Sequence, residues 1–170
     1  MKFEPTSFAP DAQRILDFAK SEMFDRTFKE GMALVEETAA YLDGPGRAAA
    51  KRLSRLGALA YAGESMRLTT RLMQVASWLL VQRAVRDGEL GLAEASHDKY
   101  RLTNRTAEGN DAMAGMEELP EALKSLAARG AAIHERVSRL DADMYAGRSD
   151  VQNRVGEQQA ILEAAFGARA

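Results

Sequence analysis

Apolar residues recur every three or four positions along three stretches of this chain, and no stretch alternates convincingly between apolar and polar residues. A spacing of three and four residues keeps side chains on one face of an α-helix, whereas a strand would need a period of two. Alanine is abundant and β-branched residues are few, which favours helices over strands. The sequence therefore predicts an all-α protein, an antiparallel three-helix bundle with long helices.

The first predicted helix covers residues 11–42. Pro10 and Asp11 indicate its start, because proline suits the first helical turn and an acidic residue stabilises the positive end of the helix dipole. The sequence DGPG at 43–46 ends this helix and begins the next, since glycine frees the backbone at a helix end. The predicted apolar face consists of Phe24, Phe28, Gly31, Val35, Thr38 and Leu42.

The second predicted helix spans residues 45–87 and ends at Gly88. Its predicted core-facing row is a heptad, flanked by mostly small residues that permit a close approach of helices. The heptad row is Leu59, Met66, Met73 and Leu80, and the flanking row is Leu56, Gly63, Thr70, Ser77 and Ala84. Residues 72–81 are apolar on almost every side, and two neighbouring helices cover only part of such a stretch. We therefore predict a homodimer whose contacts are Leu72, Val75, Trp78, Leu79 and Val81.

The third predicted helix begins near Pro120 and ends at Gly147. Its apolar face is the most regular in the chain and consists of Leu119, Leu123, Leu126, Gly130, Ile133, Val137, Leu140 and Met144. Between the second and third helices, residues 88–116 are predicted to form an irregular connection. Residues 1–147 then form a single helical-bundle domain, and residues 148–170 form a C-terminal tail that is flexible or a short helix.

The overall composition excludes several classes of protein. The chain has 170 residues and a net charge of −2, which argues against a protein that coats nucleic acid. It has no Cys, so disulfides, zinc ribbons and thiolate catalysis are excluded. The longest apolar run without charge, residues 72–82, is about half of the ~20 residues that a membrane-spanning helix needs. We therefore expect a cytoplasmic protein without a membrane segment.

Three long helices also raise the question of a di-metal carboxylate site. Such bundles use two Glu-x-x-His motifs and two further Glu residues. This chain has one match, Glu94 to His97, and it falls in the irregular connection; His134 is followed by Glu135, which is the wrong spacing. We therefore expect no metal, no cofactor and no enzymatic activity. A ferritin-like metal-binding enzyme and a purely structural dimerisation module remain as alternatives.

Two polar features are candidates for binding a partner. A polar stripe with Glu64, Arg67 and Arg71 lies within the apolar half of the second helix, where it is either the solvent edge or a recognition strip. Residues 103–110 have no apolar anchor and are typical of a loop. The candidate partner-binding residues are Glu64, Arg67, Arg71, Asn104, Arg105, Asn110 and Asp111. A basic run is interpreted instead as a solvated helical face, partly paired with acidic residues of the first helix. The basic run is Arg47, Lys51, Arg52 and Arg55, and the acidic residues are Glu30, Glu36 and Glu37.

Two blocks of the sequence closely resemble the regulator of CtrA degradation (RcdA) family of alphaproteobacteria. They are residues 30–47, EGMALVEETAAYLDGPGR, and residues 60–85, AYAGESMRLTTRLMQVASWLLVQRAV, with a weaker likeness in residues 137–145 and 158–167. The resemblance implies a small, dimeric three-helix protein without enzymatic activity. It further implies an adaptor that helps the ClpX/ClpP protease complex, ClpXP, to degrade cell-cycle regulators such as CtrA and that gathers with the protease at the cell pole.

Overall fold

A computed structural model describes residues 10–102 and 114–166, and every regular element in these residues is a helix. The predicted all-α class is therefore confirmed. The α-helices are α1 (Pro10–Ala19), α2 (Glu22–Asp43), α3 (Pro45–Ala50), α4 (Arg55–Arg86), α5 (Leu92–Ala95) and α6 (Glu121–Phe166). Two 3-10 turns, Asp98–Tyr100 and Met116–Glu118, lie in the connection between α5 and α6.

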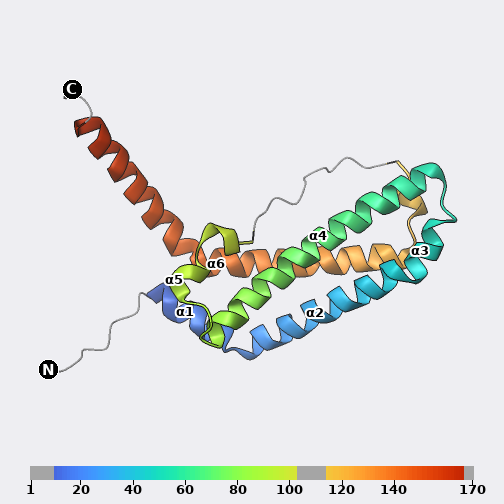
Figure 1. Ribbon diagram of the computed structural model, residues 1–170, viewed down its shortest axis with the longest axis horizontal. Helices are drawn as coiled ribbons and strands as arrows, with labels where there is room; N and C mark the ends of the chain where they lie inside the picture. The colour runs from blue at the N-terminus through green and yellow to red at the C-terminus, as the bar shows by residue number, and fades with distance from the viewer. Residues whose placement is uncertain (1–9, 103–113, 167–170) are drawn as a thin grey trace.

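The three longest helices, α2, α4 and α6, pack side by side (Figure 1). Their directions differ from the prediction, because α4 and α6 run parallel. Trp78 of α4 meets Asp141 of α6, 63 residues later, and Gln74 meets His134, 60 residues later. A nearly constant separation in sequence is the mark of a parallel pair. The long connection makes this possible. The 3-10 turn Asp98–Tyr100 follows the C-terminal end of α4, whereas Gly115, just before the second turn, lies against Leu56 at the N-terminal end of α4, so only α2 runs antiparallel to the other two.

Two predicted helices are interrupted near their N-terminal ends. Residues 11–42 form α1 and α2 rather than one helix, and the Ser21 hydroxyl oxygen accepts a hydrogen bond from the Phe24 amide at 3.2 Å. Residues 45–87 likewise divide into α3 and α4, where the Ser54 hydroxyl oxygen accepts from the Gly57 amide at 3.1 Å. Both are serine N-caps, which satisfy an amide left free in a first helical turn. These caps start new helices where the apolar spacing alone indicated continuity.

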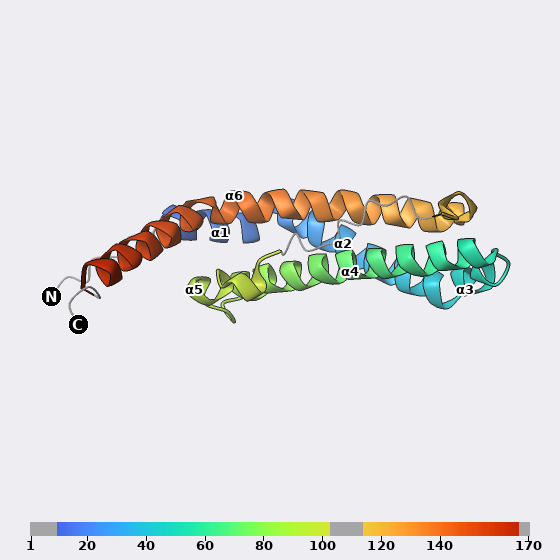
Figure 2. The same ribbon diagram turned by 90° about the horizontal axis from the view of Figure 1, so that it is seen from above.

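Helix α6 does not end at Gly147 as predicted but continues to Phe166. A glycine within a helix costs about 1 kcal/mol relative to alanine, and a glycine that ends a helix commonly does so by adopting the left-handed conformation. Among the described residues, positive φ angles occur only at Gly88 and Gly115. The C-terminal part of α6 extends beyond α2 and α4 and bends relative to the rest of the helix (Figure 2).

The predicted apolar face of α6 is the buried face. Leu123, Ile133 and Val137 are fully buried, and only Leu140 of the predicted set is half-buried. A glycine at one point of this face leaves room for α4, because a Cβ at Gly130 would lie 2.6 Å from Leu68 Cδ1 and the Leu68 side chain would have to shift. The face predicted for α2 is also correct, with Phe24, Gly31 and Thr38 buried and the remaining members half-buried.

The core row predicted for α4 is wrong. Leu59, Met66, Met73 and Leu80 point to solvent, each with more than half of its surface exposed. The buried residues lie on the opposite side of the helix and include Leu68, Leu72, Val75, Trp78, Leu79 and Val85. Because α4 is apolar on both sides, its spacing alone does not distinguish the side that faces α2 and α6.

Candidate interaction site

A row of polar contacts joins α4 to α6 within the otherwise apolar interface. Gln74 Oε1 lies 3.0 Å from His134 Nε2, and one turn later the Trp78 indole N–H donates to Asp141 Oδ1 at 2.9 Å. Gln82 Nε2 donates to the Tyr145 hydroxyl at the end of the row, a long contact of 3.5 Å. Buried polar groups are costly unless they are hydrogen-bonded, so these contacts favour one register of the two parallel helices.

Arg101 links the connection between α5 and α6 to this row of polar contacts. Its Nε lies 3.1 Å and 3.0 Å from the two carboxylate oxygens of Asp141, and its guanidinium carbon lies 4.4 Å from the centre of the Tyr145 ring. Asp141 is only 4% exposed, so its negative charge is balanced by Arg101 rather than by water. The carboxylate thus holds both α4, through Trp78, and the last described residues before position 103.

The surroundings of His134 favour the neutral form of its imidazole. Burial, together with the nearby positive charge of Arg71, lowers the pKa of His134 from its ordinary value. Burial favours the neutral imidazole because the charged form would lose its hydration. His134 therefore links the α4–α6 contact to the pH of the solution.

We expect the folded protein to lose stability as the pH falls below about 6.5, the ordinary pKa of histidine. The folded state takes up the His134 proton less readily than the unfolded chain, so the stabilisation is complete above that pH and is lost as the pH falls toward the lower folded-state pKa. Urea unfolding between about pH 7.5 and pH 5.5 measures this loss. His134→Gln should show a smaller decline, whereas the exposed His97→Gln should decline like the unmodified protein. An equal decline in both variants would exclude His134 as its source.

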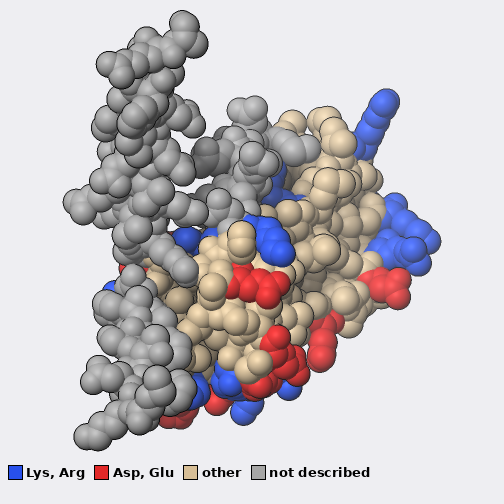
Figure 3. Space-filling model, turned by 60° about the vertical axis from the view of Figure 1, so that its left-hand side comes forward, with Lys and Arg blue, Asp and Glu red and all other residues tan. Residues whose placement is uncertain are grey.

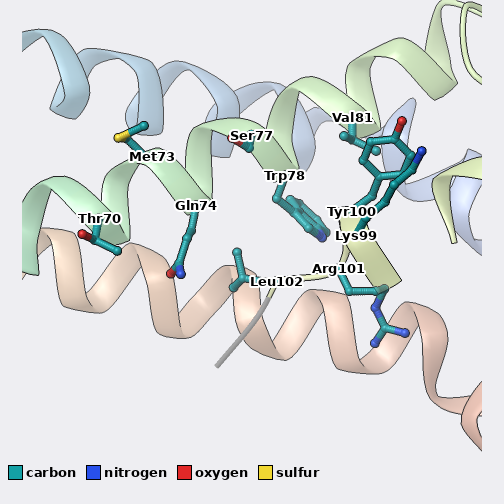
Figure 4. A pocket seen from close by; sticks show the side chains of 10 residues that line it. All are labelled: Thr70, Met73, Gln74, Ser77, Trp78, Val81, Lys99, Tyr100, Arg101 and Leu102. Atoms are coloured by element: carbon teal, nitrogen blue, oxygen red, sulfur yellow. The ribbon is translucent and has the colours of Figure 1, made fainter. Parts of the chain in front are cut away.

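A pocket of about 480 Å³ opens beside the polar row, between α4 and the 3-10 turn at Asp98–Tyr100 (Figure 4). Gln74 and Trp78 extend from α4 toward α6, and Arg101 reaches α6 from the connection. The remaining lining residues are Thr70, Met73, Ser77, Val81, Lys99, Tyr100 and Leu102. Apolar residues and the cationic side chains of Lys99 and Arg101 together line the pocket. The pocket also contacts Leu102, the last described residue before position 103.

The exposed apolar side of α4, which we call the α4 face, adjoins the pocket and shares Thr70, Met73 and Ser77 with it. Its large members are 52–72% exposed and are Leu56, Leu59, Met66, Met73 and Leu80. Between them lie the smaller residues Gly63, Thr70, Ser77 and Ala84. None of these nine residues is charged, and five of the six large apolar residues found exposed in the described chain belong to this face. An exposed apolar row of this kind is typical of surfaces that contact a protein, a membrane or a ligand.

The predicted dimer contacts are not on the α4 face. Leu72, Val75, Trp78 and Leu79 are 0–3% exposed within the chain's own core, and Val81 is half-buried beside the pocket. The first four therefore have no surface to offer a second copy, and the contact set predicted for dimerisation needs correction. Helix α4 does carry apolar residues that its own chain leaves exposed, as the prediction assumed. They belong to the heptad row from Leu59 to Leu80, which was predicted to face the core.

The polar stripe of α4 is largely occupied within the chain. Glu64 is buried and forms an ion pair with Arg67, whereas Arg71 is half-buried near His134. The other predicted partner-binding residues, Asn104, Arg105, Asn110 and Asp111, lie outside the described residues. Sequence reasoning missed Asp141 and Arg101, because their pairing depends on the parallel direction of α4 and α6.

Of the three acidic residues that were predicted to pair with the basic run, Glu30 and Glu37 pair with α6 instead. Glu30 contacts Arg136 at 2.6 Å, and Glu37 contacts Arg129 at 2.8 Å. In the basic run, Arg47 lies 3.9 Å from Asp43. Acidic and basic side chains are interspersed on the face seen in Figure 3, around a broad area of uncharged residues.

Two further searches concern metals and membranes. Within residues 10–102 and 114–166, no three His, Asp or Glu side chains are grouped so that they could hold a metal ion, and Glu94 and His97 are both exposed. No helix among the same residues is both long and apolar enough to span a bilayer.

Comparison with known proteins identifies the family. Residues 15–166 match the model of a family described as "Protein of unknown function (DUF1465)". The crystal structure of RcdA from Caulobacter crescentus CB15 is similar to this structure with a TM-score of 0.62 and 58% sequence identity, covering 74% of this chain and 93% of that chain. No functionally curated protein matches the chain. The chain thus belongs to the family of RcdA, in agreement with the resemblance of residues 30–47 and 60–85, and to the DUF1465 family.

Proposed function

We propose that this protein is a non-enzymatic adaptor that assists the regulated proteolysis of cell-cycle regulators such as CtrA by ClpXP. The observation that carries the proposal is the 58% identity to RcdA over 93% of the RcdA chain. At this level of identity, the surfaces that RcdA uses for its partners are expected to have close counterparts here. The adaptor is proposed to act as a homodimer, an antiparallel or parallel pair of helical bundles, and to be recruited with the protease to the cell pole.

The structure supports this proposal with a stiff body and an anchored connection. An adaptor needs contacts that form and release, which favours polar segments held in place by a rigid scaffold. Arg101 and the polar row hold the chain at the start of segment 103–113, beside the pocket. Cargo or protease contacts are proposed for residues 104–111, for the chain beyond Ser149, and for the solvent-exposed part of Arg67.

The test is a reconstituted degradation reaction with purified ClpXP and CtrA. We expect the full-length protein to increase the initial rate of CtrA degradation, and a rate that never changes for any candidate cargo would exclude the adaptor role. Replacement of residues 104–111 by a Gly/Ser linker, or removal of residues 149–170, should reduce delivery of at least one cargo while the helical body stays folded. If both altered proteins deliver every cargo normally, these two segments are not the contact sites.

A matched control separates a contact effect from a general change in the surface. Arg139→Ala removes an exposed side chain whose ion pair with Glu135 is also exposed, so it should leave both folding and delivery unchanged. The alternative of a purely structural dimerisation module predicts normal self-association with no effect on CtrA degradation. Measuring both properties on the same preparation distinguishes the two functions.

A further inference from the structure

We infer that a pocket at the α3 end of the bundle binds a small phosphate monoester, between two tyrosine and serine hydroxyl groups of α4 and two cationic side chains at its rim. This pocket, which we call the hydroxyl pocket, has a volume of about 480 Å³ and lies where α2, α3 and the start of α4 meet (Figure 1). Its lining residues are Leu42, Arg47, Ala50, Lys51, Tyr61 and Ser65. The inference goes beyond the proposed role in proteolysis and does not depend on it.

Two hydroxyl groups of the hydroxyl pocket have no hydrogen-bond partner among the described residues. The hydroxyl oxygens of Tyr61 and Ser65 are both shielded from solvent, yet neither meets the geometry of a hydrogen bond. The Tyr61 residue as a whole is only 9% exposed. A buried hydroxyl without a partner is costly and is rare in native proteins. A ligand oxygen that accepts hydrogen bonds from both groups would remove this cost.

The surroundings of Tyr61 keep its hydroxyl in place and protonated. A Cβ at Gly46 would lie 2.5 Å from the Tyr61 hydroxyl oxygen and 2.8 Å from the Tyr41 carbonyl oxygen, so the glycine leaves room for the hydroxyl against α3. Burial raises the pKa of Tyr61, an effect that the neighbouring Ser65 hydroxyl partly offsets. The phenol therefore stays a hydrogen-bond donor at neutral pH. Ser65 lines the pocket one turn later, and rotation about its Cα–Cβ bond turns its hydroxyl toward a ligand.

The charges at the rim of the hydroxyl pocket select an anion. Arg47 and Lys51 are exposed, and Lys51 forms no ion pair with a described residue. Arg47 has only a long contact of 3.9 Å with Asp43, whose side chain is 88% exposed, and water weakens a pair of this kind. Asp43 is the only acidic residue between positions 43 and 56, where the chain has four cationic ones. The basic run therefore gives this end of an acidic protein a local positive charge.

A phosphate monoester suits this arrangement better than a carboxylate does. Its charge of about −1.5 to −2 at pH 7 matches two cations, and its three terminal oxygens accept hydrogen bonds from hydroxyl and cationic donors together. A carboxylate has one charge and two oxygens. Leu42 and Ala50 give the organic part of the ester an apolar contact. The volume of the pocket is in the range of small-molecule sites, about 300–1,000 Å³, which favours a small ester over a protein segment.

Isothermal titration calorimetry with phenyl phosphate, on the full-length protein at constant ionic strength, tests the site. We expect one molecule to bind, and Tyr61→Phe and Lys51→Gln each to weaken binding about tenfold or more, the effect of losing a hydrogen bond to a charged group. Arg52→Gln is the matched control, because it removes an adjacent exposed cation that does not line the pocket, and it should weaken binding less than about twofold. Equal weakening by Lys51→Gln and Arg52→Gln, or no binding at all, would overturn the inference.

Urea unfolding of Tyr61→Phe separates a ligand-binding hydroxyl from a structural one. Without phenyl phosphate, this variant should be at least as stable as the unmodified protein, because it removes a buried hydroxyl that has no partner. With phenyl phosphate, the unmodified protein should gain stability and the variant should gain much less. A loss of stability in Tyr61→Phe without the ligand would show that the hydroxyl bonds within the protein, contrary to the inference.

Two further probes test the class of ligand. Benzoate offers the same ring with a carboxylate and should bind more weakly than phenyl phosphate; equal affinity would contradict the preference for phosphate. A phosphoserine peptide should bind no more tightly than phenyl phosphate, and tighter binding would assign the pocket to a phosphorylated protein instead. These measurements contain neither ClpXP nor CtrA, so failure of the hydroxyl pocket is distinguishable from failure of the adaptor role.

Discussion

Val137→Asp should destabilise the folded protein by about 3–5 kcal/mol, the range for a buried charge without a partner. Val137 has no exposed surface and belongs to the core where α6 packs against the other long helices. The substitution removes apolar contacts and places a carboxylate among apolar side chains, where the loss of hydration has no compensation. Urea unfolding followed by circular dichroism measures the change in free energy.

Ala132→Asp is the matched control for this substitution. It introduces the same carboxylate on the same helix at an exposed position, so the free energy of unfolding should fall by less than about 1 kcal/mol, chiefly through the lower helix propensity of aspartate. If Val137→Asp proved as stable as Ala132→Asp, the assignment of the buried face of α6 would be wrong.

Asp141→Ala should destabilise the protein by about 2–3 kcal/mol and release the connection from the bundle. The substitution leaves the buried indole N–H of Trp78 without an acceptor and Arg101 without its carboxylate. The ionic part of the loss is the smaller one, because the Arg101 side chain is 25% exposed and remains partly hydrated. Trp78 is the only tryptophan in the chain, so the tryptophan fluorescence comes from this residue and reports on its surroundings.

Two variants separate the contact of Asp141 with Trp78 from its contact with Arg101. Asp141→Asn keeps an acceptor oxygen for the indole and should preserve the Trp78 emission while weakening the hold on Arg101. Arg101→Gln should leave the hydrogen bond between Trp78 and Asp141 in place and weaken only the attachment of the connection. Faster cleavage of the connection by a protease that does not require a basic residue would detect this change. If Asp141→Ala left both the stability and the emission unchanged, the carboxylate would have no role in joining the connection to α4 and α6.

The candidate site was only partly predictable from the sequence. The excess of apolar residues in α4 and the basic run from Arg47 to Arg55 are properties of the chain itself, and the structure places them on the α4 face and beside the hydroxyl pocket. The polar row could not be predicted, since Gln74 and His134 are 60 residues apart and come together only because α4 and α6 run parallel. Sequence spacing places a residue on a helix face but does not say which residue of another helix lies opposite.

By itself the sequence determined the helical class and the buried faces of α2 and α6. On these helices a single apolar row is bordered by polar residues, so the hydrophobic effect allows only one side to be buried. The tertiary structure decided the buried side of α4, where apolar residues such as Val75 and Met73 lie on opposite sides and burial of either would be favourable. It also decided the parallel direction of α6, because a long connection permits both directions and the closer fit, with Leu68 against Gly130 and Trp78 bonded to Asp141, selects between them.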